Sequence, residues 1–150
     1  MKRAICHEAG HAVVALYLGF YIEKIEVSQG LPRVICALDS VQETHDERYI
    51  FLAGGIASEK LLYGDYDREA SRRDQSMSTE RGGGTIDTYL PQALNILRLN
   101  ENCLLRFRER LTLAWVQEAA ASAFEADTDS FELLPRAEIE HIWKTCQNNR

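Results

Sequence analysis

The segment from Arg3 to Gly19 is apolar on every side yet carries three ionisable side chains within five residues. It contains no proline, and its apolar residues recur at helical spacing. Val14, Ala15 and Leu18 make the opposite side apolar as well, so we expect a buried helix that ends at Gly19. Burying a polar side chain without a partner costs free energy. His7, Glu8 and His11 must therefore find partners inside the protein.

These three residues form the pattern His-Glu-x-x-His. Histidines four residues apart project from one helix face with Cβ atoms ~5 to 6 Å apart, so the rings of His7 and His11 can reach one metal ion. Zinc is the natural candidate. Glu8 points to the side of that face, where it can act as a general base on zinc-activated water without being a ligand. The alternative is a pair of ordinary buried histidines with hydrogen-bond partners.

Two histidines leave the coordination incomplete, and the third ligand decides the class of metallopeptidase. In metzincins the motif continues to a third histidine, but Tyr17 stands at that position and Val14 at the position of the preceding glycine. That class is excluded. A glutamate from a downstream helix would suit a thermolysin-like site, but Glu23 and Glu26 fall on a predicted strand.

The rest of the chain predicts a mainly α protein with a small β-sheet between the first two helices. Residues 22–28 and 33–38 have β-branched content around a turn at residues 30–32, which favours a hairpin. A second helix is expected from about Glu43 to Tyr63. Further helical patterns follow: a turn at residues 71–74, then residues 91–111, 115–124 and 135–146. We interpret residues 1–150 as a single domain, with residues 80–85 as its most flexible point.

Composition excludes some partners. The formal net charge is −6 and the pI is about 5.2, so there is no basic surplus for nucleic acid or for an anionic membrane. We expect no membrane segment, because no stretch reaches the ~18 apolar residues that a spanning helix needs. The residues after Phe20 do not resemble a signal-peptide cleavage site. The four cysteines are far apart in sequence, which favours reduced thiols and a cytoplasmic protein.

Two blocks of the sequence resemble the peptidase domain of the FtsH family, the membrane-bound ATP-dependent zinc proteases of bacteria and organelles. The blocks are HEAGHAVV, from His7 to Val14, and LAGGIASEKLLYGDYDREASRRD, from Leu52 to Asp74. The resemblance implies an FtsH-peptidase-like helical zincin domain with Asp74 as third zinc ligand. A carboxylate is chemically suited to that role and leaves a fourth position for water. Glu59 is implied to lie beside the site as a supporting group and not as a ligand.

The glycine pair in the second block predicts a close contact. Gly54 and Gly55 together cost a helix ~2 kcal/mol relative to alanines, so we expect them where the second helix packs tightly, against the helix of the site. There are also departures from the family. Lys60 replaces a glutamate, Arg73 replaces an asparagine, and Gly82 to Gly84 interrupt a region that is helical in the family.

The expected function is that of a zinc-dependent endopeptidase acting on peptides or unfolded proteins. No G-x-x-x-x-G-K-[ST] loop is present, so we expect cleavage to be independent of ATP. Extended substrate is expected to add to the sheet edge near Arg33 to Leu38, where Pro32 can begin an edge strand. The alternative is a catalytically inactive relative that keeps zinc and serves as a binding or regulatory module. Intact Glu8 favours the enzyme, because a structural zinc site needs no base.

Overall fold

The computed structural model of the chain describes residues 2–36, 45–69, 71–80, 86–122 and 130–149. Within these residues the protein is mainly helical with a small antiparallel sheet, as predicted. The helices are α1 (Lys2–Tyr17), α2 (His45–Tyr63), α3 (Arg72–Glu80), the 3-10 turn η2 (Ile86–Thr88), α4 (Leu90–Leu99), α5 (Glu101–Ser122) and α6 (Arg136–Asn148). The strands are β1 (Ile22–Ser28), β2 (Leu31–Cys36) and β3 (Ser130–Pro135).

The predicted hairpin between the first two helices is formed by β1 and β2. Its turn lies at Gln29 and Gly30, which both have positive φ, of 52° and 75°. Two consecutive residues with positive φ make the tight turn that matches strand twist. The predicted position of the turn at residues 30–32 was wrong, because Leu31 and Pro32 already pair with β1. Residues 37–38, the predicted end of the second strand, lie outside the described residues.

The sequence interpretation missed β3. Among the described strands the order is β2-β1-β3, so β1 is central and β2 lies at an edge. The buried residues of β3, Leu133 and Leu134, are adjacent and do not alternate. The pairing of β1 with β3 has a register shift between Ile25 and Glu26, which accounts for the lost alternation. A short strand without period-two alternation leaves little signal in a sequence.

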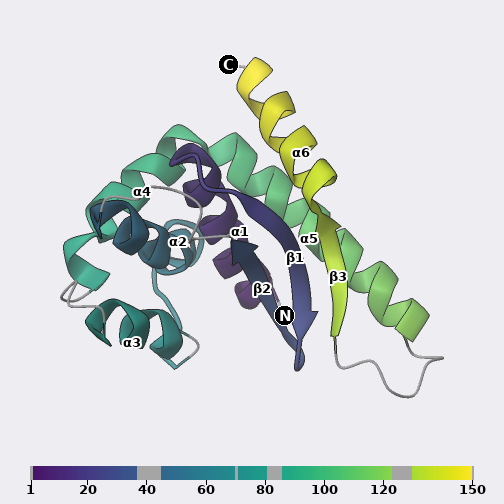
Figure 1. Ribbon diagram of the computed structural model, residues 1–150, viewed down its shortest axis with the longest axis horizontal. Coiled ribbons are helices and arrows are strands. Elements are labelled where there is room, and N and C mark those ends of the chain that lie inside the picture. Colours follow the sequence, from purple (N-terminus) through teal and green to yellow (C-terminus); the bar gives the residue numbers. More distant parts are fainter. Residues whose placement is uncertain (1, 37–44, 70, 81–85, 123–129, 150) are drawn as a thin grey trace.

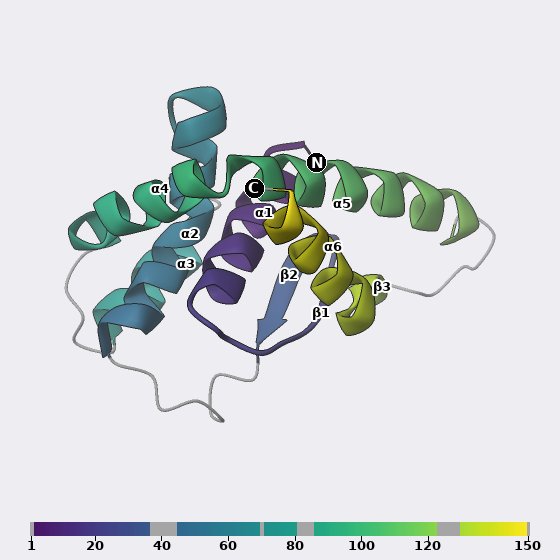
Figure 2. The same cartoon turned by 90° about the horizontal axis from the view of Figure 1, so that it is seen from above.

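Helix α1 lies at the centre of the fold, between α2 on one side and the sheet on another, with α5 also packed against it (Figures 1 and 2). The buried helix predicted from its apolar sides is therefore confirmed. It packs most closely on α2 where glycine meets glycine: a Cβ on Gly10 would lie 2.3 Å from the carbonyl oxygen of Gly54. The expected close packing at Gly54 is confirmed.

The remaining helices agree with the predicted ones only in part, since the helical segment expected at residues 91–111 is divided at Asn100 into α4 and α5. Helix α3 begins at Arg72 and extends the expected turn to Glu80. Pro91 lies in the first turn of α4, and Pro135 immediately precedes α6. The segment expected as a separate helix at residues 115–124 continues α5 as far as Ser122. Residues 82–84 and 123–124 lie outside the described residues. No helix in the described part of the chain is long and apolar enough to cross a membrane.

Candidate metal centre

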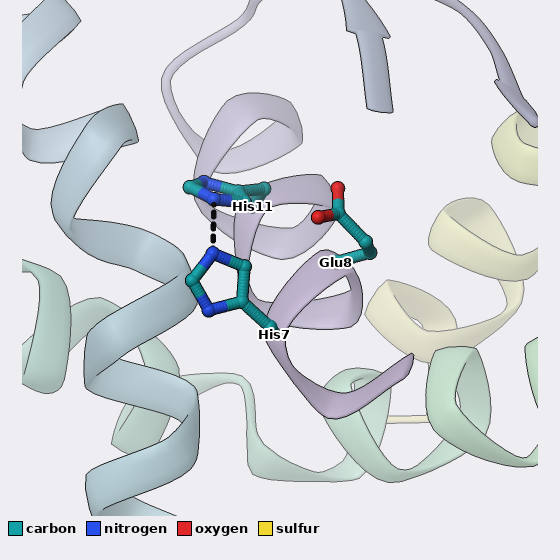
Figure 3. Close-up of side chains that lie close together, drawn as sticks. All are labelled: His7, Glu8 and His11. Carbon is teal, nitrogen blue, oxygen red and sulfur yellow. Dashed lines mark hydrogen bonds between the residues drawn. The ribbon is translucent and has the colours of Figure 1, made fainter. Parts of the chain in front are cut away.

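The two histidines of α1 face one another in the interior. His7 and His11 are 7% and 5% exposed, and their Nε2 atoms lie 3.0 Å apart (Figure 3). The helical spacing predicted this convergence of the rings. The carboxylate of Glu8 lies to one side of them (Figure 3). The ligand atoms of these three side chains lie within 4.8 Å of one another, so the group could hold a metal ion.

Asp74 reaches the same point from α3. Its Oδ2 atom lies 2.8 Å from Nε2 of His7 and 3.2 Å from Nε2 of His11. Asp74 is in the first turn of α3, which brings its short side chain over the α1 face. Three atoms from two helices therefore converge on one small volume.

The hydrogen bond at Nδ1 of each histidine determines whether the other ring nitrogen, Nε2, faces this volume as an acceptor. Nδ1 of His11 lies 2.9 Å from the carbonyl oxygen of Phe51, which can only accept, so this nitrogen donates. Nδ1 of His7 lies 2.7 Å from the Glu59 carboxylate and donates to it. In the neutral rings both Nε2 atoms then carry lone pairs. These lone pairs and the Asp74 carboxylate face one another, an arrangement that a proton on a ring nitrogen or a metal ion would stabilise.

The pKa shifts of the three side chains also show that the cluster stabilises positive charge. Burial lowers the pKa of His7, but the hydrogen bonds to Asp74 and Glu59 outweigh it and raise that pKa to about 10. Burial also lowers the pKa of His11, and the negative charge of Asp74 outweighs it, so the pKa is raised. Burial would raise the pKa of Asp74, but the two histidines hold it well below its usual value. Protons on the rings are thus one way to satisfy the cluster.

A metal ion is another way, and the geometry fits one. Ligand atoms ~2.0 to 2.1 Å from a tetrahedral metal are about 3.3 Å from one another. The three contacts among His7, His11 and Asp74 are 2.8, 3.0 and 3.2 Å, slightly shorter than this. Two imidazoles and one carboxylate also form a donor set that suits zinc and leaves a further position open.

Glu59 connects the centre to its surroundings. It is 1% exposed, and while Oε1 accepts from His7, Oε2 accepts from the backbone N–H of Asp67 at 2.9 Å. The guanidinium of Arg3 lies 3.6 Å from Oε2 and offsets the buried negative charge. The structure thus places Glu59 beside the site and against a histidine, where a carboxylate fixes ring orientation in metal centres.

Gly55 provides the space that the His7 ring occupies. A Cβ on Gly55 would lie 2.3 Å from Nε2 of His7 and 2.5 Å from two carbons of the ring. No side chain can be accommodated at that distance without moving the ring. The two glycines therefore have different roles. The missing side chain at Gly54 lets helix α1 pack closely, and the missing side chain at Gly55 leaves room for the imidazole of His7.

Glu8 is held on the side of the centre that faces the sheet. Its Oε2 atom accepts a hydrogen bond of 2.9 Å from the backbone N–H of Val34 in β2. Burial raises the pKa of Glu8, and the two histidines oppose this rise. A carboxyl group with a raised pKa beside the centre is suited to accept and return a proton.

A cleft of about 520 Å³ opens onto the centre. Its walls are α1, the edge strand β2, α2 and α3. The three predicted metal ligands, Glu8 and Glu59 all line it, together with residues 31–36 of β2. Apolar side chains, including those of Phe51, Leu52 and Met77, form part of the wall.

Other acidic residues, two in the second block and one on β1, have different partners. Asp65 accepts from Arg3 at 2.6 Å, Glu69 pairs with Arg72, and Glu26 pairs with Lys24. The sequence analysis did not predict two groups of the site, the carbonyl of Phe51 and the N–H of Val34. Both are backbone groups, which every residue type carries, so a sequence gives no signal for them.

The chain matches no protein-family model, and no curated protein shows significant similarity to it.

Proposed function

We propose that the protein is a zinc-dependent endopeptidase in which His7, His11 and Asp74 hold the metal and Glu8 is the general base. The observation that carries the proposal is the convergence of three lone-pair atoms at 2.8 to 3.2 Å, with the Glu8 carboxylate beside them in an open cleft. Zinc is favoured over other metals by the two-imidazole, one-carboxylate donor set. The resemblance to FtsH-family peptidases supports the same assignment of residues.

When bound, zinc would act as a Lewis acid. It would lower the pKa of its water to about 7 and polarise a carbonyl group. The side chains do the rest. Glu8 accepts a proton from the attacking water and delivers it to the amine that leaves when the peptide bond breaks. Glu59 and the Phe51 carbonyl hold the two rings in the tautomer that keeps each Nε2 directed at the centre.

The edge strand β2 suggests how a substrate would lie. Residues 31–36 line the cleft, and β2 is the edge of the sheet in the described residues. An extended peptide can add to such an edge through backbone hydrogen bonds. The proposed substrates are therefore peptides and unfolded proteins, whose backbone can adopt a strand, and cleavage is independent of ATP.

Cleavage of denatured casein by the zinc-loaded protein tests the proposal. The wild type should cleave it, with or without ATP, and should leave a stably folded protein intact. Glu8→Gln should bind zinc and fold as the wild type does but lose a factor of ~10² to 10⁴ in rate, the usual contribution of a general base. Glu23→Gln, which alters an exposed glutamate on β1, is the matched control and should remain active.

Equal rates for Glu8→Gln and wild type would refute the assigned role of Glu8. Absence of cleavage by a wild type that binds zinc would favour the non-catalytic zinc module instead.

A further inference from the structure

The backbone N–H of Val34 points away from the sheet. In the β1–β2 ladder Ile25 is opposite Val34 and Val27 is opposite Pro32. In an antiparallel ladder hydrogen-bonded and non-hydrogen-bonded pairs alternate, so residues two apart orient their N–H groups in the same direction, and Pro32 has no N–H to give to β1. The hydrogen bond from Val34 to Glu8 shows directly that this N–H faces the cleft. It is an edge donor of the kind that pairs with an added strand.

Pro32, which precedes Val34 on the cleft side, cannot donate. A peptide that lies along residues 31–36 therefore meets the Val34 N–H as the donor in the middle of the strand. In the structure that donor is already bound, by Oε2 of Glu8 at 2.9 Å.

We propose that the Val34 N–H is a binding point for a backbone carbonyl of an extended substrate, and that Glu8 occupies it until the substrate displaces it. This inference rests on the proposed function, because it concerns the proposed base and the proposed substrate edge. Substrate pairing with β2 and release of the Glu8 carboxylate then become one event. A ligand too short to pair with β2 leaves Glu8 bound to the strand.

If Glu8 and the substrate compete for the Val34 N–H, removal of Glu8 changes substrate affinity in a way that it would not if this N–H only positioned Glu8. A carboxylate is a stronger acceptor of an N–H than a peptide carbonyl is. Glu8 therefore opposes substrate binding, and its removal strengthens that binding. If the Val34 N–H served only to position Glu8, the removal of Glu8 would leave substrate affinity unchanged.

The test is peptide binding to the metal-free protein, in which no cleavage can interfere. The probe is an uncharged hexapeptide with blocked ends, titrated into ¹⁵N-labelled protein and followed through backbone amide signals. The Val34 signal should move on titration, and Glu8→Ala should bind the peptide about fivefold or more tightly than wild type. The matched control, Glu23→Ala, should bind as wild type does. An unmoved Val34 signal, or unchanged or weaker binding by Glu8→Ala, would overturn the inference.

A second variant removes the donor itself. Val34→Pro deletes an N–H that faces away from the ladder, a position at which an edge strand tolerates proline. It should weaken peptide binding, and adding Glu8→Ala to it should give no gain. A gain as large as that in the wild-type background would show that Glu8 acts elsewhere. If Val34→Pro fails to fold, the Glu8→Ala affinity and the Val34 signal decide alone.

These measurements separate the inference from the proposed function. A protein that cleaves casein but binds peptide no more tightly after Glu8→Ala would refute the competition alone. One that shows the competition but cleaves nothing would refute the peptidase assignment alone.

Discussion

At the scale of single residues, the centre is defined by the direction of each lone pair. The spacing of His7 and His11 on a helix predicts that their rings meet, and they do. Spacing cannot predict which nitrogen of each ring faces the partner. That depends on the Phe51 carbonyl and on Glu59, which the fold brings from α2. The meeting of the two rings could thus be predicted from the sequence, whereas the nitrogen that each ring directs at its partner required the structure.

The raised pKa values of the two histidines predict that zinc and protons compete. With its pKa at about 10, the metal-free His7 ring keeps a proton at neutral pH that zinc must displace, and the raised pKa of His11 adds to the competition. Zinc affinity should rise with pH between about pH 6 and 8.5, by about tenfold per unit for each proton displaced. Calorimetry in buffers with different ionisation enthalpies measures that release.

The direction of this pH dependence of zinc affinity follows from the raised pKa of the histidines. A raised pKa means that the protonated ring is the form stabilised in the folded metal-free protein, so lowering the pH strengthens the competitor of the metal. An affinity that is constant over this range would contradict the assignment of both rings as ligands.

At the scale of elements, the site depends on how closely α1 and α2 approach. The glycine pair predicted a tight contact, because glycine is costly inside a helix unless something needs the space. The prediction could not say which glycine served which purpose. That depends on the relative rotation of two packed helices, which is set by the whole interface. Strand β3 was not predicted for a similar reason, because its pairing with β1 joins segments about a hundred residues apart.

Two alanine variants separate the uses of the glycines. Gly55→Ala should keep the helix but displace the His7 ring, because the new Cβ would lie 2.3 Å from Nε2, and zinc binding should be lost. Gly54→Ala is the control. Its Cβ would meet the Gly10 carbonyl oxygen at 3.0 Å and Val14 Cγ2 at 3.1 Å, not the ring. It should lower the free energy of unfolding by ~1 to 3 kcal/mol through overpacking and still bind zinc.

Denaturant unfolding and a competition titration with a zinc chelator measure the two effects separately. Normal zinc affinity in Gly55→Ala would show that His7 is not a ligand in its present position.

At the scale of the whole molecule, the centre joins parts of the chain that only the fold brings together. Asp74 follows His11 by 63 residues and comes from a different helix. The loop that leads into α3 is anchored where Asp67 donates to Glu59, and Glu59 in turn binds His7. The resemblance of the second block pointed to Asp74, but its distance from the rings could come only from a structure.

The most direct test of the three-ligand centre is the equilibrium affinity for zinc of the wild type, Asp74→Ala and Asp65→Ala. Asp65 is exposed and pairs with Arg3, so its removal should leave the affinity unchanged. The wild type should bind one zinc per chain. Asp74→Ala should bind it more weakly by more than the ~10- to 100-fold that loss of a group supporting a ligand costs. Zinc affinity in Asp74→Ala equal to that of the wild type would contradict the account.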